Sequence, residues 1–227
     1  MRFPPIYKHI YDTKTANDYF ISGDSGAGYL NPTLLLPDPE TGRRGESNIT
    51  KSGADAWIKW NTAWYKQFDL SYTGFLINGA AGPLNNASIA MYHSFSPDGV
   101  VVTTGHDVPG MTKYQGEAWC DAEGTPVMHH IIDMPSNLTL CAEQVAGMVA
   151  ADRKIARLQH PFEPDHQPPM FYILRNILWK ASHMVDAAAA ISAAVEGGIE
   201  FVDPYTLGLL VKCHTRTVDC SRSGAAE

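Results

Sequence analysis

The chain has 227 residues, of which 44% are hydrophobic and 18% charged, and this is enough to bury one core, so we expect a single domain over residues 1–227. Lys and Arg number 17 against 24 Asp and Glu, and the net charge of -7, without a basic run, excludes a nucleic-acid partner. No apolar stretch approaches the roughly 20 residues of a membrane span, so no membrane partner is expected either.

Short apolar runs alternate with helical patterns along the chain. The apolar runs predict strands over residues 18–22, 72–78, 99–103, 126–132, 170–174 and 199–202. Apolar residues in helical spacing predict helices over residues 54–68, 140–158 and 184–195, and a further helical run covers residues 205–212. This order of strand, helix and strand is typical of an α/β fold with a parallel sheet.

Each predicted strand is followed by a side chain that can hydrogen-bond or titrate. In chain order these side chains are Asp24, Asn78, His106 with Asp107, Asp133, Arg175 with Asn176, and Asp203. In a (β/α) barrel the carboxyl ends of the strands converge on one face, so these residues would surround a single pocket. The pattern therefore predicts a functional site at that face.

The turn after the first predicted strand is rich in glycine. Gly23, Gly26 and Gly28 allow a tight turn and the close approach of a ligand, and Asp24 lies within the turn. A glycine-rich, acid-bearing turn at the end of a short strand is where α/β folds place ligand chemistry. We therefore expect this turn to form part of the site.

The same residues carry a resemblance to a known family. Gly26, Gly28, Tyr29 and Pro32 match the signature of the GxGYxYP family of carbohydrate-processing proteins, whereas Asn31 stands where the family has its second tyrosine. The agreement continues through residues 72–79, 95–99 and 199–205. The chain is similar to this family over residues 3–212.

The resemblance also has implications for the fold. In the family the catalytic-type domain opens with further strands, the first ending in an acid-rich Ser-Asp-Gly-Asp-Asn stretch, and a separate domain precedes it. Met1 falls just before a segment, Pro4-Pro5-Ile6-Tyr7, that is interior in the family. We expect a (β/α)-barrel-like parallel sheet that is incomplete at its N-terminal side, and an upstream domain of the same gene product as a missing partner.

The family implies hydrolysis of glycosidic bonds in an oligo- or polysaccharide by two carboxyl groups, without a cofactor or metal. The predicted acid residues are Asp24, Glu117 and Asp203; the two aromatics beside Glu117 could raise its pKa for general-acid work. The predicted substrate-binding residues are Tyr29, Asn78, His106, Asp133, Arg175 and Tyr205.

Structural interpretations and other functions remain open beside this one. Asp24 could organise its turn through an Asx-type hydrogen bond, and Asp203, followed by Pro204, has the position of a helix N-cap. A non-catalytic carbohydrate-binding domain or a truncated inactive remnant is the main alternative, and the departure at Asn31 favours it slightly. A second alternative is a metal-dependent polysaccharide deacetylase with His106, Asp107, His129 and Asp133, although these residues lack a recognised ligand spacing.

Sequons and cysteines bear on localisation. Asn48, Asn86 and Asn137 each begin an Asn-x-Ser/Thr sequon, and the chain has four cysteines, so we expect a secreted glycoprotein. Proximity favours a bridge between Cys213 and Cys220. Chance sequons with reduced, buried thiols would be the alternative.

Overall fold

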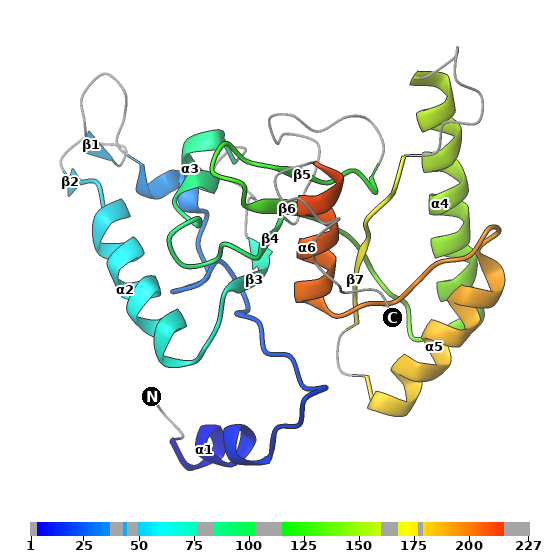
Figure 1. Cartoon of the computed structure of the whole chain (residues 1–227), viewed down its shortest axis with the longest axis horizontal. Helices are drawn as coiled ribbons and strands as arrows, with labels where there is room; N and C mark the ends of the chain where they lie inside the picture. Colours follow the sequence, from blue (N-terminus) through cyan, green and yellow to red (C-terminus); the bar gives the residue numbers. More distant parts are fainter. Residues whose placement is uncertain are drawn as a thin grey trace.

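A five-stranded, mostly parallel sheet forms the centre of the molecule (Figure 1). The computed structural model describes residues 4–36, 43–44, 50–76, 84–102, 115–159, 168–176 and 179–215. The strands of the sheet are β3 (Tyr72–Leu76), β4 (Gly99–Val102), β6 (Pro126–Asp133), β5 (Trp119–Cys120) and β7 (Ile173–Arg175). The order is β3-β4-β6-β5, and β7 pairs with β6; β3, β4, β6 and β7 run parallel, whereas β5 is antiparallel to β6.

The helices agree well with the sequence periodicity. They are α1 (Pro4–Thr13), α2 (Ala54–Gln67), α3 (Asn86–Ala90), α4 (Leu138–Gln159), α5 (Ala181–Ala194) and α6 (Pro204–His214), with a short 3-10 helix at Pro32–Leu35 and an antiparallel ribbon of β1 (Arg43–Arg44) and β2 (Thr50–Lys51). The four predicted helices are confirmed as α2, α4, α5 and α6, whereas α1 and α3 were not predicted. Among the described residues, no helix is both long and apolar enough to cross a bilayer.

The sheet is covered on both faces because its side chains alternate between two apolar clusters. Val100 and Val102 of β4 pack with α2 and α3, whereas Val101 packs with α6. Alternation along a strand sends successive side chains to opposite faces. The helices α2 and α3 therefore lie on one face and α6 on the other, and Figure 1 shows α6 lying between α2 and the pair α4 and α5.

A third apolar cluster joins α4 to α5. Val145 and Val149 of α4 pack against Ile191 of α5, and Leu174 of β7 packs onto the same cluster. At the other end of the molecule, α1 contacts the end of α2, where the ring of Phe68 meets Tyr7 at a centroid distance of 5.7 Å. These contacts hold α4 and α5 together beside β7, and α1 against the end of α2.

The predicted parallel sheet is confirmed, but the described strands form an open sheet and show no closure into a barrel. The predicted strand at residues 18–22 is reduced to one bridge, in which Ser22 pairs in parallel with Thr73. The prediction of a strand at residues 199–202 is wrong: this extended segment pairs with no described strand, and Ile199 instead packs on the cluster of α4 and α5. The single-domain prediction stays a prediction.

The predicted strand at residues 170–174 also has different bounds. Phe171 donates its backbone N–H to the carbonyl of Gly116 at 2.7 Å, so this part of the segment pairs with residues that precede β5. Only Ile173–Arg175 pairs with β6. The strand is therefore shorter than predicted and extends one residue further, which places Arg175 inside it.

Candidate functional site at the carboxyl-terminal edge of the sheet

The glycine-rich loop, defined here as residues 23–30, leaves the sheet directly after Ser22 and is held by three side chains. Asn61 accepts a hydrogen bond from the N–H of Ala27 at 2.7 Å, and the indole Nε1 of Trp57 donates to the carbonyl of Ala27 at 3.1 Å. The hydroxyl of Tyr92 donates to the carbonyl of Ser25 at 2.9 Å. Because all three side chains are buried, the backbone of the loop is fixed before any ligand arrives.

Two positions of this loop need their particular residues. Gly26 has φ +98°, and a Cβ there would lie 2.7 Å from Oδ1 of Asn61, so a side chain would displace the clamp. Asn31 is buried and caps the 3-10 helix, where its Oδ1 accepts from the N–H of Thr33 at 2.9 Å and Pro32 follows at the first helical position. The residue that departs from the signature therefore has a structural role.

Asp24 is the acidic residue of the loop and lies at the carboxyl-terminal edge of the sheet. Its φ of +49° is in the left-handed region, which Asp and Asn tolerate better than most residues. Its side chain is exposed, and its carboxylate forms no hydrogen bond to another described residue. The Asx-type hydrogen bond is therefore not seen, and Asn61 organises the turn in its place.

Asp133 and Arg175 form an ion pair where β6 and β7 end. The strand register places them opposite each other, with Nε to Oδ1 at 2.6 Å and Nη2 to Oδ2 at 2.7 Å. Such a bidentate pair has defined geometry, and the Nη1 group takes no part in it. The hydrogen bond to Asp133 raises the pKa of Arg175, and the nearby phenol of Tyr29 makes a smaller contribution in the same direction.

The guanidinium of Arg175 also lies over an aromatic ring on a strand that is not its neighbour. Its Cζ is 4.3 Å from the ring centroid of Phe75 on β3, although β4 and β6 separate β3 from β7 in the sheet. The two side chains therefore meet across β4 and β6. Tyr29, Phe75, Asp133 and Arg175 are named the carboxyl-edge cluster below; Tyr29 is 72% exposed.

Asp203 and Tyr205 lie elsewhere. Oδ1 of Asp203 accepts from the N–H groups of Tyr205 at 2.9 Å and Thr206 at 3.0 Å, so Asp203 is the N-cap of α6. Burial raises the pKa of Asp203, but the hydrogen bonds from Thr206 and Tyr205 outweigh burial and hold the pKa below its usual value. The hydroxyl of Tyr205 donates to the carbonyl of Phe20 at 2.7 Å.

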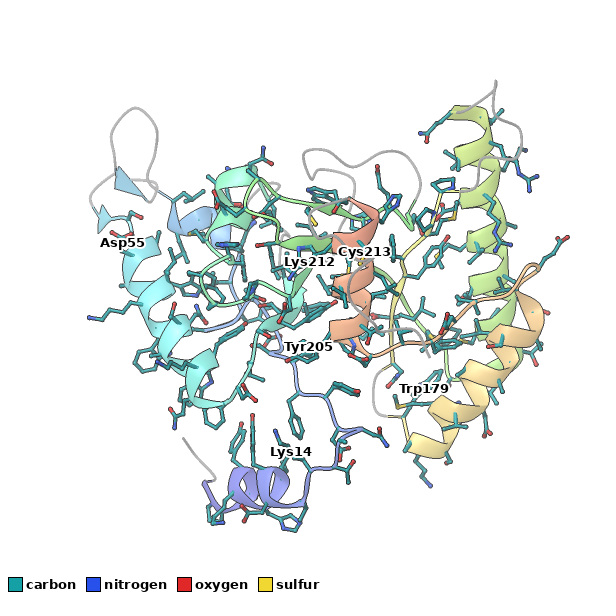
Figure 2. All side chains as sticks on the ribbon, viewed as in Figure 1. Lys14, Asp55, Trp179, Tyr205, Lys212 and Cys213 are labelled. Carbon is teal, nitrogen blue, oxygen red and sulfur yellow. The ribbon has the colours of Figure 1, made fainter. Side chains whose placement is uncertain are left out.

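Tyr205 also contacts Tyr72, the first residue of β3, at a ring centroid distance of 5.9 Å, and Figure 2 shows it near the start of α6. The structure thus places Asp203 and Tyr205 near the amino ends of the strands and does not bring them to the carboxyl-edge cluster. The physical reason is that residues 199–202 form no strand of the sheet, so their end is not one of its carboxyl ends.

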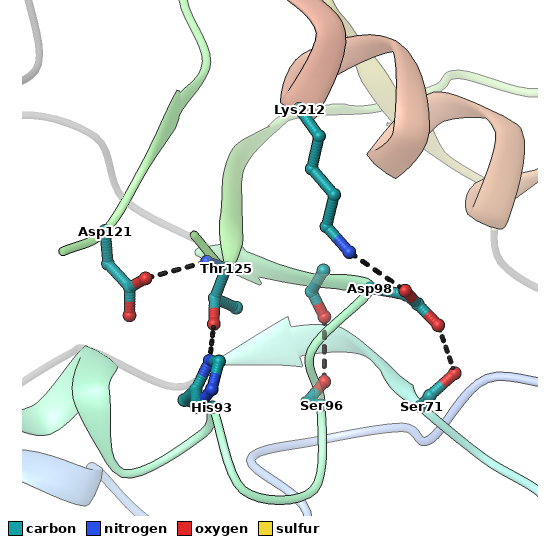
Figure 3. Close-up of polar contacts among 8 residues, drawn as sticks. Ser71, His93, Ser96, Asp98, Asp121, Thr125 and Lys212 are labelled. Atoms are coloured by element: carbon teal, nitrogen blue, oxygen red, sulfur yellow. Dashed lines mark hydrogen bonds and ion pairs between the residues drawn. The ribbon is translucent and has the colours of Figure 1, made fainter. Parts of the chain in front are cut away.

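A polar network fixes α6 to this amino-terminal edge (Figure 3). Lys212 Nζ lies 3.0 Å from Oδ1 of Asp98, and the hydroxyl of Ser71 donates to Oδ2 of Asp98 at 2.6 Å. Asp98 directly precedes β4 and Ser71 directly precedes β3. The polar side chains of this edge therefore bind one another, and their role is structural.

Glu117 is held near the sheet by a buried carboxylate that the sequence analysis did not select. Asp152 on α4 is 3% exposed and accepts from the N–H groups of Gln115 at 3.0 Å and Gly116 at 2.8 Å. The hydroxyl of Tyr172 donates to the same carboxylate at 3.1 Å. Glu117 itself precedes β5, which pairs with the first residues of β6, so its backbone does not lie at the carboxyl end of β6.

Several candidates lie outside the described residues, namely Asn78, His106 and Asp107. In the described part of the chain, no group of three or more His, Cys, Asp and Glu side chains could hold a metal ion.

Phe75 and Asn61 were missed by the sequence analysis. The signal for Phe75 was its place near the end of a predicted strand, whereas Asn61 could have been noticed as a polar residue on the apolar face of its helix.

The comparison with known proteins gives one family. The family model described as "GxGYxYP putative glycoside hydrolase C-terminal domain" matches residues 1–212. No curated protein and no solved structure matches the chain.

Proposed function

Because this chain belongs to the GxGYxYP C-terminal domain family, we propose that it acts on carbohydrate and binds a glycan with the glycine-rich loop and the carboxyl-edge cluster. One observation carries this proposal: the guanidinium of Arg175, paired with Asp133, lies over the ring of Phe75, and the exposed phenol of Tyr29 is near enough to act on its charge. Charged donors and acceptors suit the hydroxyl groups of a sugar, and an aromatic face suits its C–H face. The fixed loop supports binding without a large ordering cost.

The chemistry we propose is hydrolysis of a glycosidic bond. In such a reaction one carboxyl group protonates the leaving oxygen, and the second acts as base or nucleophile. Asp24 is our proposal for one of these groups, since its exposed carboxylate makes no hydrogen bond to a described residue. Both carboxylate oxygens of Asp133 accept a hydrogen bond from Arg175, which suits a hydroxyl acceptor better than an acid.

A substitution at Asp24 separates hydrolysis from binding alone. Asn tolerates the left-handed backbone of Asp24, so Asp24→Asn should keep the loop and remove only the charge. We expect turnover of a polysaccharide substrate to fall by 100-fold or more, on the order of what general acid–base catalysis contributes, with binding unchanged. Asp186→Asn, on the exposed surface of α5, is the matched control. Equal turnover in wild type and Asp24→Asn would contradict this assignment.

Binding itself is tested with a panel of soluble and insoluble polysaccharides. Tyr29→Ala removes an exposed ring of the proposed site and should weaken binding about fivefold, the loss of roughly 1 kcal/mol of stacking. Trp60→Ala removes an exposed ring from α2 and should leave binding unchanged. A similar loss in both variants, or binding to no polysaccharide, would count against the proposed surface.

We also propose that the protein is secreted. The three sequons support this, and Cys213 is disulfide-bonded, whereas Cys120 and Cys141 are free thiols. Asn137 has an exposed side chain whose Oδ1 accepts from the N–H of Leu140 at 3.0 Å, so a glycan there would lie at the start of α4. Expression in a secreting eukaryotic host, followed by enzymatic removal of N-glycans, should lower the mass of the product. An unchanged mass would argue against glycosylation.

A further inference from the structure

A cavity of about 640 Å³ lies on the face of the sheet that α6 covers. Side chains of β7, α5 and α6 contribute to its wall, together with Phe201 and Val202 of the segment before α6. The wall is apolar almost throughout, and Asn176 and Glu200 are its polar members. This volume is that of a small-molecule site, which is typically an apolar cavity with a few polar groups.

The rim of the cavity is unusual for a surface in water. Four large apolar residues of its wall are exposed, namely Ile21, Met184, Val185 and Phe201. Single exposed apolar side chains are common, but several at one opening form a patch that typically marks a binding site. Ile21 precedes the glycine-rich loop by two residues, so this part of the rim lies close to the start of that loop.

The cavity also reaches the carboxyl-terminal edge of the sheet, where the carboxyl-edge cluster lies. Its wall includes Gly74, Met134 and Asn176, which are the chain neighbours of Phe75, Asp133 and Arg175. Because successive residues of a strand face opposite sides of the sheet, the cluster and the cavity meet around this edge, and a ligand that contacts the ion pair with polar groups would place its apolar group around the edge in the cavity. We propose that the ligand is a glycoside whose aglycone, an alkyl or aromatic group, occupies this cavity. This inference rests on the proposed function for the sugar part alone.

The test compares ligands that differ only in the apolar part. Binding of methyl, butyl and octyl glucoside, each below its micelle concentration, and of 1-octanol is measured by isothermal titration calorimetry. Because burial of each methylene group is favourable, we expect octyl glucoside to bind at least tenfold more tightly than methyl glucoside. We also expect 1-octanol to bind saturably and to compete with octyl glucoside.

A matched pair of substitutions on α5 locates the binding. Ala188 lines the cavity, whereas its neighbour Ala189 is exposed. Ala188→Phe should fill the cavity and weaken octyl glucoside at least tenfold, and Ala189→Phe should not. Phe201→Ser, at a half-exposed position of the rim, should weaken the same ligand several-fold and tests the cavity independently if Ala188→Phe fails to fold.

The outcomes separate the two proposals. Octanol binding that Ala188→Phe abolishes, without any glycan binding, would retain the cavity site and overturn the proposed function. Glycan binding without dependence on alkyl length would retain the proposed function and overturn the cavity site. A dimer, detected by sedimentation, that Ala188→Phe and Phe201→Ser dissociate while octyl glucoside does not bind would assign the rim to a second copy of the chain and also overturn the inference.

Discussion

The two edges of one sheet differ in how they use their polar side chains. At the amino-terminal edge, Asp98 binds Lys212 and Ser71, and Asp203 caps α6. At the carboxyl-terminal edge, Asp24 and Tyr29 are exposed on a loop whose backbone is fixed by buried side chains. The difference teaches that polar residues alone do not indicate a site: those that only tie elements together hold the fold, whereas exposed residues on a rigid backbone, and the exposed pair of Asp133 and Arg175, are available to a ligand.

The strongest test of the amino-terminal edge is the contact between α6 and the residue before β4. A Cβ on Gly208 would lie 2.0 Å from the backbone carbonyl oxygen of Asp98, so Gly208→Ala must displace α6. We expect a loss of about 3 kcal/mol in the free energy of unfolding, measured by urea denaturation. Gly147→Ala on α4 meets nothing within 4 Å and should stabilise by about 0.5–1 kcal/mol. The same sign for both variants would refute the contact.

The clamp of the glycine-rich loop tests whether rigidity at the carboxyl-terminal edge matters. Asn61→Ala leaves the N–H of Ala27 without its acceptor, and we expect a loss of about 2 kcal/mol in the free energy of unfolding together with weaker glycan binding. Tyr92→Phe removes one hydrogen bond to the loop and should cost about 1 kcal/mol. If Asn61→Ala lowered stability but left binding unchanged, the fixed backbone would not matter for the ligand.

Each edge of the sheet has one ion pair, and removing the cation of each pair in turn compares the two edges directly. Lys212→Met should lower the free energy of unfolding by about 1 kcal/mol and leave glycan binding unchanged, because Lys212 is largely buried against Asp98. Arg175→Met should change stability by less than about 1 kcal/mol, since its pair with Asp133 is exposed, but should weaken glycan binding about tenfold or more. Denaturation and calorimetry of both variants check this, and equal effects on binding would remove the distinction between the edges.

The pH dependence of the cap gives the smallest expected effect. The pKa of Asp203 is lowered in the folded state, so the charged cap stabilises the protein above the unfolded pKa, and this stability is lost as pH falls through the folded pKa. Asp203→Asn keeps a capping oxygen but cannot titrate. We expect wild type to be more stable by about 0.5 kcal/mol at pH 6, with the advantage disappearing at acidic pH. A difference that is independent of pH would contradict the charged cap.

Helical spacing and capping residues in the sequence were sufficient to predict most of the helices. Helical spacing placed α2, α4 and α5 within a few residues of their bounds, and Pro204 after Asp203 correctly indicated the N-cap of α6. The apolar run at residues 199–202 was misassigned because a strand requires a partner, and the run itself does not reveal whether one is present. Asp203 and Tyr205 were consequently placed at the wrong edge.

The parts of the site that were missed depend on contacts between distant residues. Asn61 lies 34 positions from Ala27, and Asp152 lies 36 positions from Gly116. Each is a polar side chain on the apolar face of a helix, a pattern that in sequence only weakens the prediction of the helix. The ion pair of Asp133 and Arg175 was anticipated as two separate candidates, because strand register decides that they meet.

The contact of Arg175 with Phe75 joins β7 to β3, two strands that are not neighbours in the sheet. A ligand that draws the guanidinium of Arg175 toward its own oxygen atoms would compete with the ring of Phe75 and the carboxylate of Asp133 for the same group. Occupancy of the site is in this way linked to contacts that β3, β6 and β7 share through one side chain.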